Sequence, residues 1–160
     1  MSQRKSRYSE KPSDYDHRFH AGNVGDVFKH CALLAWLEAL QAGEQPLHLI
    51  DTHAGAGMFK LPGQGEWQEG IGRLDGLDDA PTAVRAYLDA AGAKRKVGKG
   101  GLYPGSPAFS RGALRAEDRL TLCELADAPR EKLETHYASD AQVQVRGGDG
   151  LEALVDIAKK

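Results

Sequence analysis

The sequence has 160 residues, enough for one domain with a single core. Hydrophobic residues make up 41% and charged residues 28%, which excludes a largely disordered chain. The sequence has no stretch long enough to cross a bilayer and no apolar secretory signal, so we expect a cytoplasmic protein without a membrane partner. With 21 basic and 23 acidic residues, the net charge of -2 limits any nucleic-acid binding to local patches. Cys31 and Cys123 lie in apolar segments and are expected to be buried thiols.

The N-terminal third predicts a tail, a long helix and a strand. Residues 1–14 have no hydrophobic periodicity and are expected to form a flexible basic tail, with the folded part, 15–160, starting near Tyr15. Asn23 is the expected N-cap of a helix that ends at Gly43, and its apolar residues on more than one face predict a buried helix of about five turns. A short apolar run, 47–50, then predicts a strand that enters a glycine-rich turn.

The rest of the chain predicts an insertion followed by alternating strands and helices. Residues 58–103 contain two expected helices, Gln68–Leu74 and Pro81–Ala91, and no evident strand, so they predict an inserted helical subdomain. Ser106 before Pro107 predicts a helix with a serine N-cap. Strands at 119–123 and 143–146 then alternate with helices at 127–138 and 150–158. This alternation indicates an α/β fold whose parallel sheet is covered on both faces.

Three turns are expected at one edge of this sheet. The run Asp51-x-His53-x-Gly55-x-Gly57 follows the first strand, Glu124 follows the second, and Asp149 follows the third. Two such carboxylates suit the hydroxyls of a ribose and the amine of an adenine. The glycine turn alone fits a tight turn without a ligand equally well, but the three positions together indicate the cofactor site of a class I methyltransferase.

Two features near the N-terminus suit contact with nucleic acid. The segment 15–23 mixes aromatic, imidazole and cationic groups, which fits base stacking and phosphate contact as well as a loop that caps the core. Lys29 and His30 interrupt an apolar helix, and a charge there usually has a partner or a function. The run 94–99 is the densest basic cluster and is predicted to contact RNA phosphates, with a solvated loop as the alternative.

Several motifs in order give the chain a specific resemblance. They are Tyr15-x-His17-x-Phe19-His20-Ala21-Gly22-Asn23, Asp26-Val27-x-Lys29-His30, the turn 51–57, Tyr103-Pro104-Gly105-Ser106-Pro107, and Glu124-Leu125. In this order and approximate spacing, from Tyr15 to about Leu154, the chain resembles the bacterial ribosomal RNA large subunit methyltransferase J family.

The resemblance implies a fold, a reaction and a set of site residues. It implies a Rossmann-like class I fold and N6-methylation of an adenosine in 23S ribosomal RNA, with S-adenosyl-L-methionine as cofactor and a monomer when the protein is full length. The residues implied in the cofactor pocket are His30, His53, Ser106, Glu124, Asp149 and Gly150. Those implied to face and position the target adenosine are Tyr15, His17 and Lys29.

One family motif is absent from these 160 residues. Amino-methylating members of the fold hold the adenine with an Asp-Pro-Pro-Tyr turn after the fourth strand. The sequence has no such turn, and the resemblance implies that it would follow shortly beyond Lys160. We therefore expect the chain to end before the fourth strand, to leave strand 47–51 as an unpaired edge, and to be inactive alone.

Two other interpretations of the sequence remain open. The older label of the same family, a protein involved in catabolism of external DNA, suggests a nuclease-like enzyme. Among the six histidines, only His17 and His20 form a close pair, so we expect no metal site. The other alternative is a fragment that binds the cofactor or RNA without catalysis.

Overall fold

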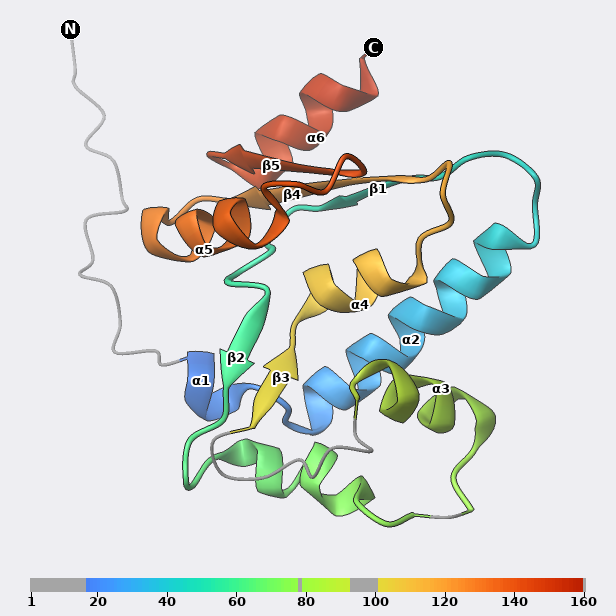
Figure 1. The fold of residues 1–160 in the computed structure, drawn as a ribbon, viewed down its shortest axis with the longest axis vertical. Coiled ribbons are helices and arrows are strands. Elements are labelled where there is room, and N and C mark those ends of the chain that lie inside the picture. The colour runs from blue at the N-terminus through green and yellow to red at the C-terminus, as the bar shows by residue number, and fades with distance from the viewer. Residues whose placement is uncertain (1–16, 78, 93–100, 160) are drawn as a thin grey trace, which may run out of the picture.

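The computed structural model describes residues 17–77, 79–92 and 101–159 (Figure 1). It has an α/β architecture, with a three-stranded parallel sheet and a two-stranded antiparallel sheet. The parallel sheet confirms the predicted fold class at this level. The expected tail at 1–14, the predicted site residue Tyr15 and the basic run 94–99 lie outside the described residues.

The parallel sheet consists of β1 (His48–Asp51), β4 (Arg119–Glu124) and β5 (Val143–Gly147), in the order β1-β4-β5. The central strand β4 is buried over four consecutive residues, as a strand covered on both faces requires. In the register, Asp51 is opposite Leu122 and Glu124 is opposite Gly147. The carboxyl ends of the three strands therefore lie close to one another. Within the described sheet, β1 is an edge strand.

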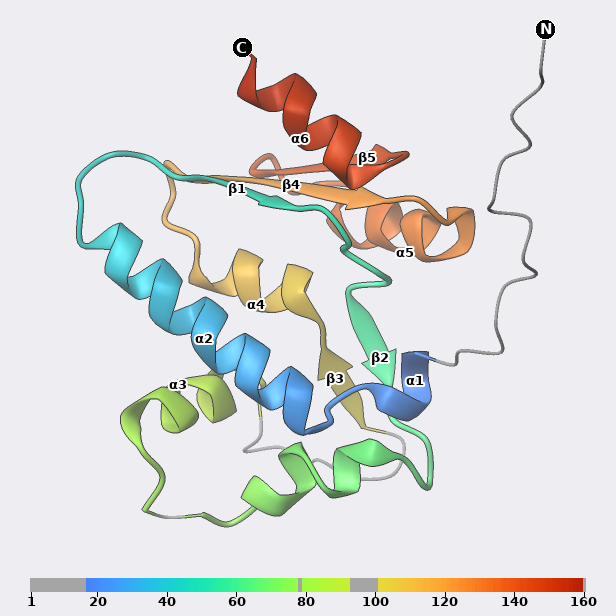
Figure 2. The same cartoon turned by 180° about the vertical axis from the view of Figure 1, so that it is seen from behind.

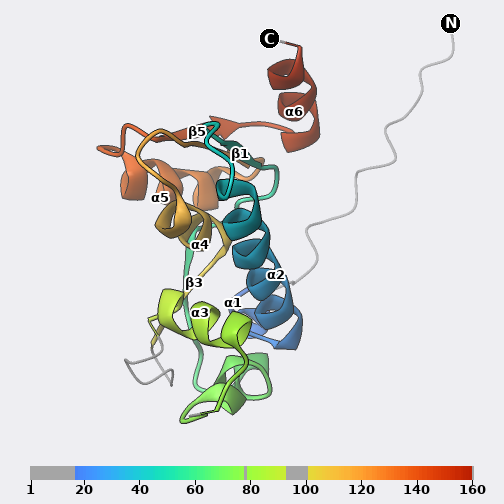
Figure 3. The same cartoon turned by 90° about the vertical axis from the view of Figure 1, so that its right-hand side faces the viewer.

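Helices lie on both faces of this sheet, as the alternating pattern predicts. Figures 2 and 3 show α4 (Ser106–Ala113) and α5 (Asp127–Tyr137) on one side and α6 (Gly150–Ala158) on the other. Leu120 and Leu122 of β4 pack with Leu133 and Tyr137 of α5 in one of two hydrophobic cores. No helix in the described ranges has the length and apolar character needed to cross a membrane.

The long N-terminal helix forms as predicted, but it is not buried. Helix α2 (Val24–Gln41) is capped by Asn23, whose side-chain oxygen accepts a hydrogen bond from the N–H of Asp26 at 2.9 Å. Of its side chains only His30 and Leu37 are buried. Its large exposed apolar residues recur at multiples of four positions, on one side of the helix: Val24, Phe28, Trp36 and Leu40. The predicted burial was wrong because, among the described residues, α3 (Thr82–Ala90) and α4 pack against α2 and leave these side chains exposed.

Segment 58–103 also differs from the predicted helical insertion, because strands stand at both of its ends. β2 (Met58–Lys60) pairs antiparallel with β3 (Leu102–Pro104), and the segment between them holds α3 and two short 3-10 helices, η1 (Glu66–Gln68) and η2 (Ile71–Leu74). Strands of three residues are too short for an alternating pattern to reveal them.

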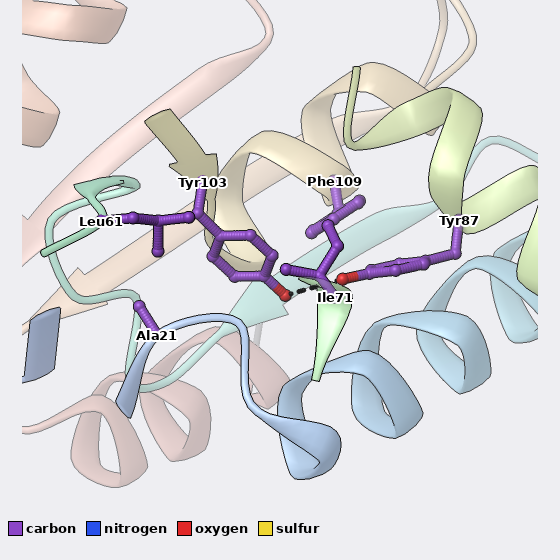
Figure 4. Packing of buried hydrophobic residues seen from close by; sticks show 6 residues of the cluster. All are labelled: Ala21, Leu61, Ile71, Tyr87, Tyr103 and Phe109. Carbon is purple, nitrogen blue, oxygen red and sulfur yellow. Dashed lines mark hydrogen bonds between the residues drawn. The ribbon is translucent and has the colours of Figure 1, made fainter. Parts of the chain in front are cut away.

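The segment shares a core with the rest of the chain. This second core contains Ala21, Leu61, Ile71, Tyr87, Tyr103 and Phe109, which approach one another in Figure 4. Ala21 precedes α2 and Phe109 lies on α4, so residues from both sides of the segment complete the core. It is therefore packed into the fold and does not form a core of its own.

A buried carboxylate fixes the amino end of the parallel sheet. Asp118 is fully buried and accepts hydrogen bonds from the N–H of Leu47, the amide of Gln41 and the guanidinium of Arg115. The hydrogen-bonded guanidinium of Arg115 holds the pKa of Asp118 well below its usual range. These contacts connect the ends of α2 and α4 to the start of β1. They lie at the amino ends of the parallel strands, opposite the carboxyl ends where the candidate site lies.

Candidate functional site

The three turns at the carboxyl edge of the sheet meet directly. The N–H of Ala54 donates to the carbonyl of Cys123 at 3.0 Å, and the N–H of Gly55 donates to Oε2 of Glu124 at 2.8 Å. On the other side of the glycine turn, a Cβ added to Gly150 would lie 2.0 Å from the carbonyl oxygen of Thr52. Only a glycine at 150 lets the turn after β5 approach the turn after β1 so closely.

Glu124 links two turns and keeps capacity for a ligand. Its Oε2 accepts from Gly55, and its Oε1 accepts from the N–H of Ala126 at 2.8 Å. An ionised carboxylate offers about four lone-pair positions, and the backbone uses two of them. The remaining two suit a pair of neighbouring hydroxyl groups.

The glycine turn has the backbone geometry that its sequence requires. Gly55 and Gly57 have φ angles of +64° and +75°, in the left-handed region that favours glycine. The N–H of Gly105 donates to the carbonyl of Gly57 at 2.8 Å, which brings the start of α4 against the turn. A Cβ on Gly105 would lie 2.9 Å from the ring of Phe59, so a glycine is needed there as well.

A cavity of about 260 Å³ opens beside these turns. Four residues of the predicted site line it: Lys29, His30, His53 and Ser106. Gly55, Phe59 and Tyr103 also contribute to its wall. Glu124, Asp149 and Gly150 do not line it, but Glu124 is one hydrogen bond away through Gly55, and Gly150 contacts Thr52 beside His53. The structure therefore gathers these predicted residues at one end of the sheet.

His30 is a buried titratable group of the cavity wall. It is buried, its Nδ1 lies 2.9 Å from the hydroxyl of Tyr103, and the ring of Phe109 packs 4.4 Å away between centroids. Burial lowers the pKa of His30 to about 4, against a smaller opposing effect of Asp26. His30 is therefore a neutral imidazole near pH 7.

Ser106 does not have the capping role that the sequence suggests. Gly105 is the N-cap of α4, and Ser106 is its first helical residue. The hydroxyl of Ser106 donates to Oδ2 of Asp51 at 2.6 Å, while Oδ1 of Asp51 accepts from the N–H of His53 at 3.0 Å. The serine-cap prediction was wrong: Gly105 occupies the N-cap position, and the hydroxyl of Ser106 donates its hydrogen bond to a carboxylate at the end of β1 instead.

The residues implied to face an adenosine are described only in part. Tyr15 lies outside the described residues, and for His17 only its backbone position, the first residue of α1 (His17–His20), is described. Lys29 is mostly exposed and pairs with Asp26, with 2.8 Å between Nζ and Oδ1. Its ammonium group therefore stands at the rim of the cavity.

Asp149 acts as a helix cap. It is the N-cap of α6, and its Oδ1 accepts from the N–H groups of Leu151 at 2.8 Å and Glu152 at 3.3 Å. In the described ranges, no group of three or more His, Cys, Asp or Glu side chains is arranged to hold a metal ion.

Comparison with known proteins assigns the family. Residues 44–160 match the family model described as ribosomal RNA large subunit methyltransferase D, RlmJ. The chain belongs to the ribosomal RNA large subunit methyltransferase J family. It is 37% identical over 145 residues to the protein of that name from Escherichia coli K12 and 35% identical over 149 residues to that from Haemophilus influenzae. In both comparisons the match covers 88% of this chain.

A solved structure supports the same fold. The crystal structure of protein LPL1258 from Legionella pneumophila matches with a TM-score of 0.77 and 32% identity, over 86% of this chain and 52% of that one. The chain also spans about half the length of the two J-family relatives, 52% in each case.

Two residues of this J-family chain emerge as parts of the site only from the structure. Asp51 holds both Ser106 and the backbone of His53, and Tyr103 is the hydrogen-bond partner of His30. Asp51 stands in the glycine-turn motif and Tyr103 precedes Pro104, so both are visible in the motifs. The pairing of Asp51 with Ser106 and of Tyr103 with His30 is not visible there, because the paired residues are 55 and 73 positions apart in the sequence.

Proposed function

We propose that this chain forms the cofactor-binding part of an S-adenosylmethionine-dependent methyltransferase with a Rossmann-like class I fold, which methylates N6 of an adenosine in 23S ribosomal RNA. The observation that carries the proposal is the meeting of the three strand-end turns beside the cavity lined by His30, His53 and Ser106. The names of the relatives support ribosomal RNA as the substrate.

The donor set fits such a cofactor. S-adenosylmethionine supplies an activated methyl group on a positively charged sulfur. The free lone pairs of Glu124 suit the two ribose hydroxyls, and His30 adds no positive charge to the cavity because its burial keeps it neutral. Lys29, at the rim beside Asp26, is placed to meet a nucleotide that enters from outside.

Titration calorimetry with S-adenosylmethionine tests the proposal. Glu124→Gln keeps the shape of the side chain but removes its charge and one acceptor, so we expect about ten- to a hundredfold weaker binding than wild type. Glu44→Ala, at an exposed position between α2 and β1, is the control and should bind as wild type does. Equal affinity of Glu124→Gln and wild type would remove Glu124 from the site.

Catalysis by these 160 residues alone is a separate question. They contain no Asp-Pro-Pro-Tyr turn to hold the adenine amine in line with the methyl group, and methyl transfer depends on that positioning. We expect no methyl incorporation into unmodified large-subunit RNA by this chain, and incorporation by a chain that carries such a turn. Comparable turnover by the two would mean that the adenine is held elsewhere, and binding of cofactor without turnover by either would support a binding role.

A further inference from the structure

Three buried polar groups form a chain of hydrogen bonds beside the cavity. The hydroxyl oxygen of Tyr87 on α3 lies 3.2 Å from that of Tyr103 on β3, as the dashed line in Figure 4 marks. The hydroxyl of Tyr103 lies 2.9 Å from Nδ1 of His30 on α2. Tyr87, Tyr103 and His30 are 0%, 1% and 7% exposed, so bulk water does not reach the hydroxyls. Each hydroxyl hydrogen therefore needs an acceptor within the protein.

Only one direction of donation satisfies both hydroxyls among the described residues. If Nδ1 of His30 carried the hydrogen and donated to Tyr103, then Tyr103 would donate to Tyr87. The hydrogen of Tyr87 would then have no acceptor, because Tyr103 is its one hydrogen-bond partner in the described ranges. In the opposite direction, Tyr87 donates to Tyr103, and Tyr103 donates to the bare Nδ1 of His30. Nε2 then carries the ring hydrogen.

We propose that Tyr103, whose hydroxyl accepts from Tyr87, is the positioning residue that holds His30 as the neutral tautomer with its hydrogen on Nε2. His30 thereby offers an uncharged hydrogen-bond donor to the ligand of the cavity that it lines. The identity of this ligand rests on the proposed function, but the tautomer does not. The ring of Phe109, at 4.4 Å and 32° to the imidazole, restricts rotation of His30.

The charged groups around His30 leave this arrangement in place near pH 7. Asp26 and Lys29 lie on the same helix, and Asp51 faces it from the end of β1. The two carboxylates favour protonation and Lys29 opposes it, but burial outweighs them and lowers the pKa to about 4. Protonation of Nδ1 would also direct a second ring hydrogen at the hydroxyl of Tyr103, and both hydrogen bonds would then have to reverse their direction.

Long-range proton–nitrogen correlation spectra of protein with ¹⁵N-labelled histidine test the tautomer. In the wild type we expect His30 to have a bare Nδ1 and a protonated Nε2. Tyr103→Phe removes the donor to Nδ1 and should give a mixture of tautomers. Tyr87→Phe leaves Nδ1 of His30 as the one described acceptor for the hydroxyl of Tyr103, so this variant should keep the wild-type tautomer. Both variants keep an aromatic ring at the substituted position. The control Tyr137→Phe removes a buried hydroxyl from the other core and should leave His30 unchanged. A protonated Nδ1 in the wild type, or an unchanged tautomer in Tyr103→Phe, would overturn the proposal.

Calorimetry on the same proteins tests the consequence for the ligand. Tyr103→Phe should bind S-adenosylmethionine about three- to tenfold more weakly than wild type and Tyr137→Phe. If the tautomer changes but the affinity does not, the proposed link from His30 to the ligand is wrong. If wild type shows the expected tautomer but does not bind the cofactor, the positioning role stands and the proposed function fails.

Discussion

Acidification should destabilise the protein through His30 before most carboxylates begin to titrate. Burial lowers the pKa of this imidazole from 6.5 to about 4. In the unfolded chain it binds a proton near pH 6.5, and in the folded protein it stays neutral until the pH approaches 4. Between these values the unfolded state binds more protons, so stability is complete above pH 6.5 and falls as the pH is lowered.

The size of the effect follows from the same two values. At about 1.4 kcal/mol per pH unit, the interval from 6.5 to about 4 lowers the free energy of unfolding by about 3 kcal/mol. Native proteins have free energies of unfolding of about 5 to 15 kcal/mol, so this loss is a large fraction of the total stability. Asp118 and Asp140, whose pKa values are lowered from 3.8, affect stability below pH 4, outside this window.

Urea unfolding followed by circular dichroism at pH 7.5, 6.0 and 4.5 measures this loss. We expect wild type and His136→Gln, at an exposed histidine of α5, to lose most of the 3 kcal/mol between pH 7.5 and 4.5. His30→Gln, which cannot be protonated, should have a lower stability at pH 7.5 and a nearly flat dependence in this range. A wild type without the loss, or a His30→Gln variant that retains it, would refute the burial of a neutral His30.

Three further predictions concern packing and RNA binding. Leu37→Ala should lower the free energy of unfolding by about 2 to 5 kcal/mol, because Leu37 is only 2% exposed. Its neighbour Trp36 is 76% exposed, so Trp36→Ala should change the free energy of unfolding by no more than about 0.5 kcal/mol. Urea unfolding of the two variants compares them. Gly150→Ala should lower the melting temperature, because a Cβ at 150 would lie 2.0 Å from the backbone of Thr52. Gly112→Ala serves as the comparison, because a Cβ at 112 meets no atom within 4 Å and Gly112 does not have a positive φ. Replacing the basic residues of 94–99 by alanine should make RNA binding less dependent on salt. In filter-binding measurements, the slope of log affinity against log salt concentration should fall by about 0.7 to 0.9 for each phosphate that the variant no longer neutralises. An unchanged slope would exclude contact of this run with RNA phosphates.

The regular part of the fold was predictable from the sequence because its signals are local. Asn23 caps α2 through the N–H of Asp26, three positions away, and the apolar run of β4 matches a strand covered on both faces. The three strand ends were predicted together because parallel strands bring their carboxyl ends to one edge of a sheet. That placement put Glu124 beside the glycine turn, where its carboxylate accepts from Gly55.

The parts that sequence reasoning missed depend on contacts distant in the sequence. The helix α2 is apolar on more than one side. Its own residues do not show which of these sides α3 and α4 cover. Ser106 before Pro107 fits the local pattern of a helix cap, but its hydroxyl donates a hydrogen bond to Asp51, 55 positions earlier. Tyr87 looks like any aromatic residue on the apolar face of a helix, and only its distance to Tyr103 reveals a polar role.

The same contacts explain why segment 58–103 bears on the site. Phe59 of β2 and Tyr103 of β3 line the cavity, and Tyr87 of α3 reaches it through Tyr103. Pairing of β2 with β3 sets Tyr103 opposite Phe59, so the contact of His30 with Tyr103 depends on the fold of this segment. A substitution in this segment that moves Tyr103 away from His30 should therefore change the tautomer of His30. The segment thus forms part of the wall of the cavity through Phe59 and Tyr103.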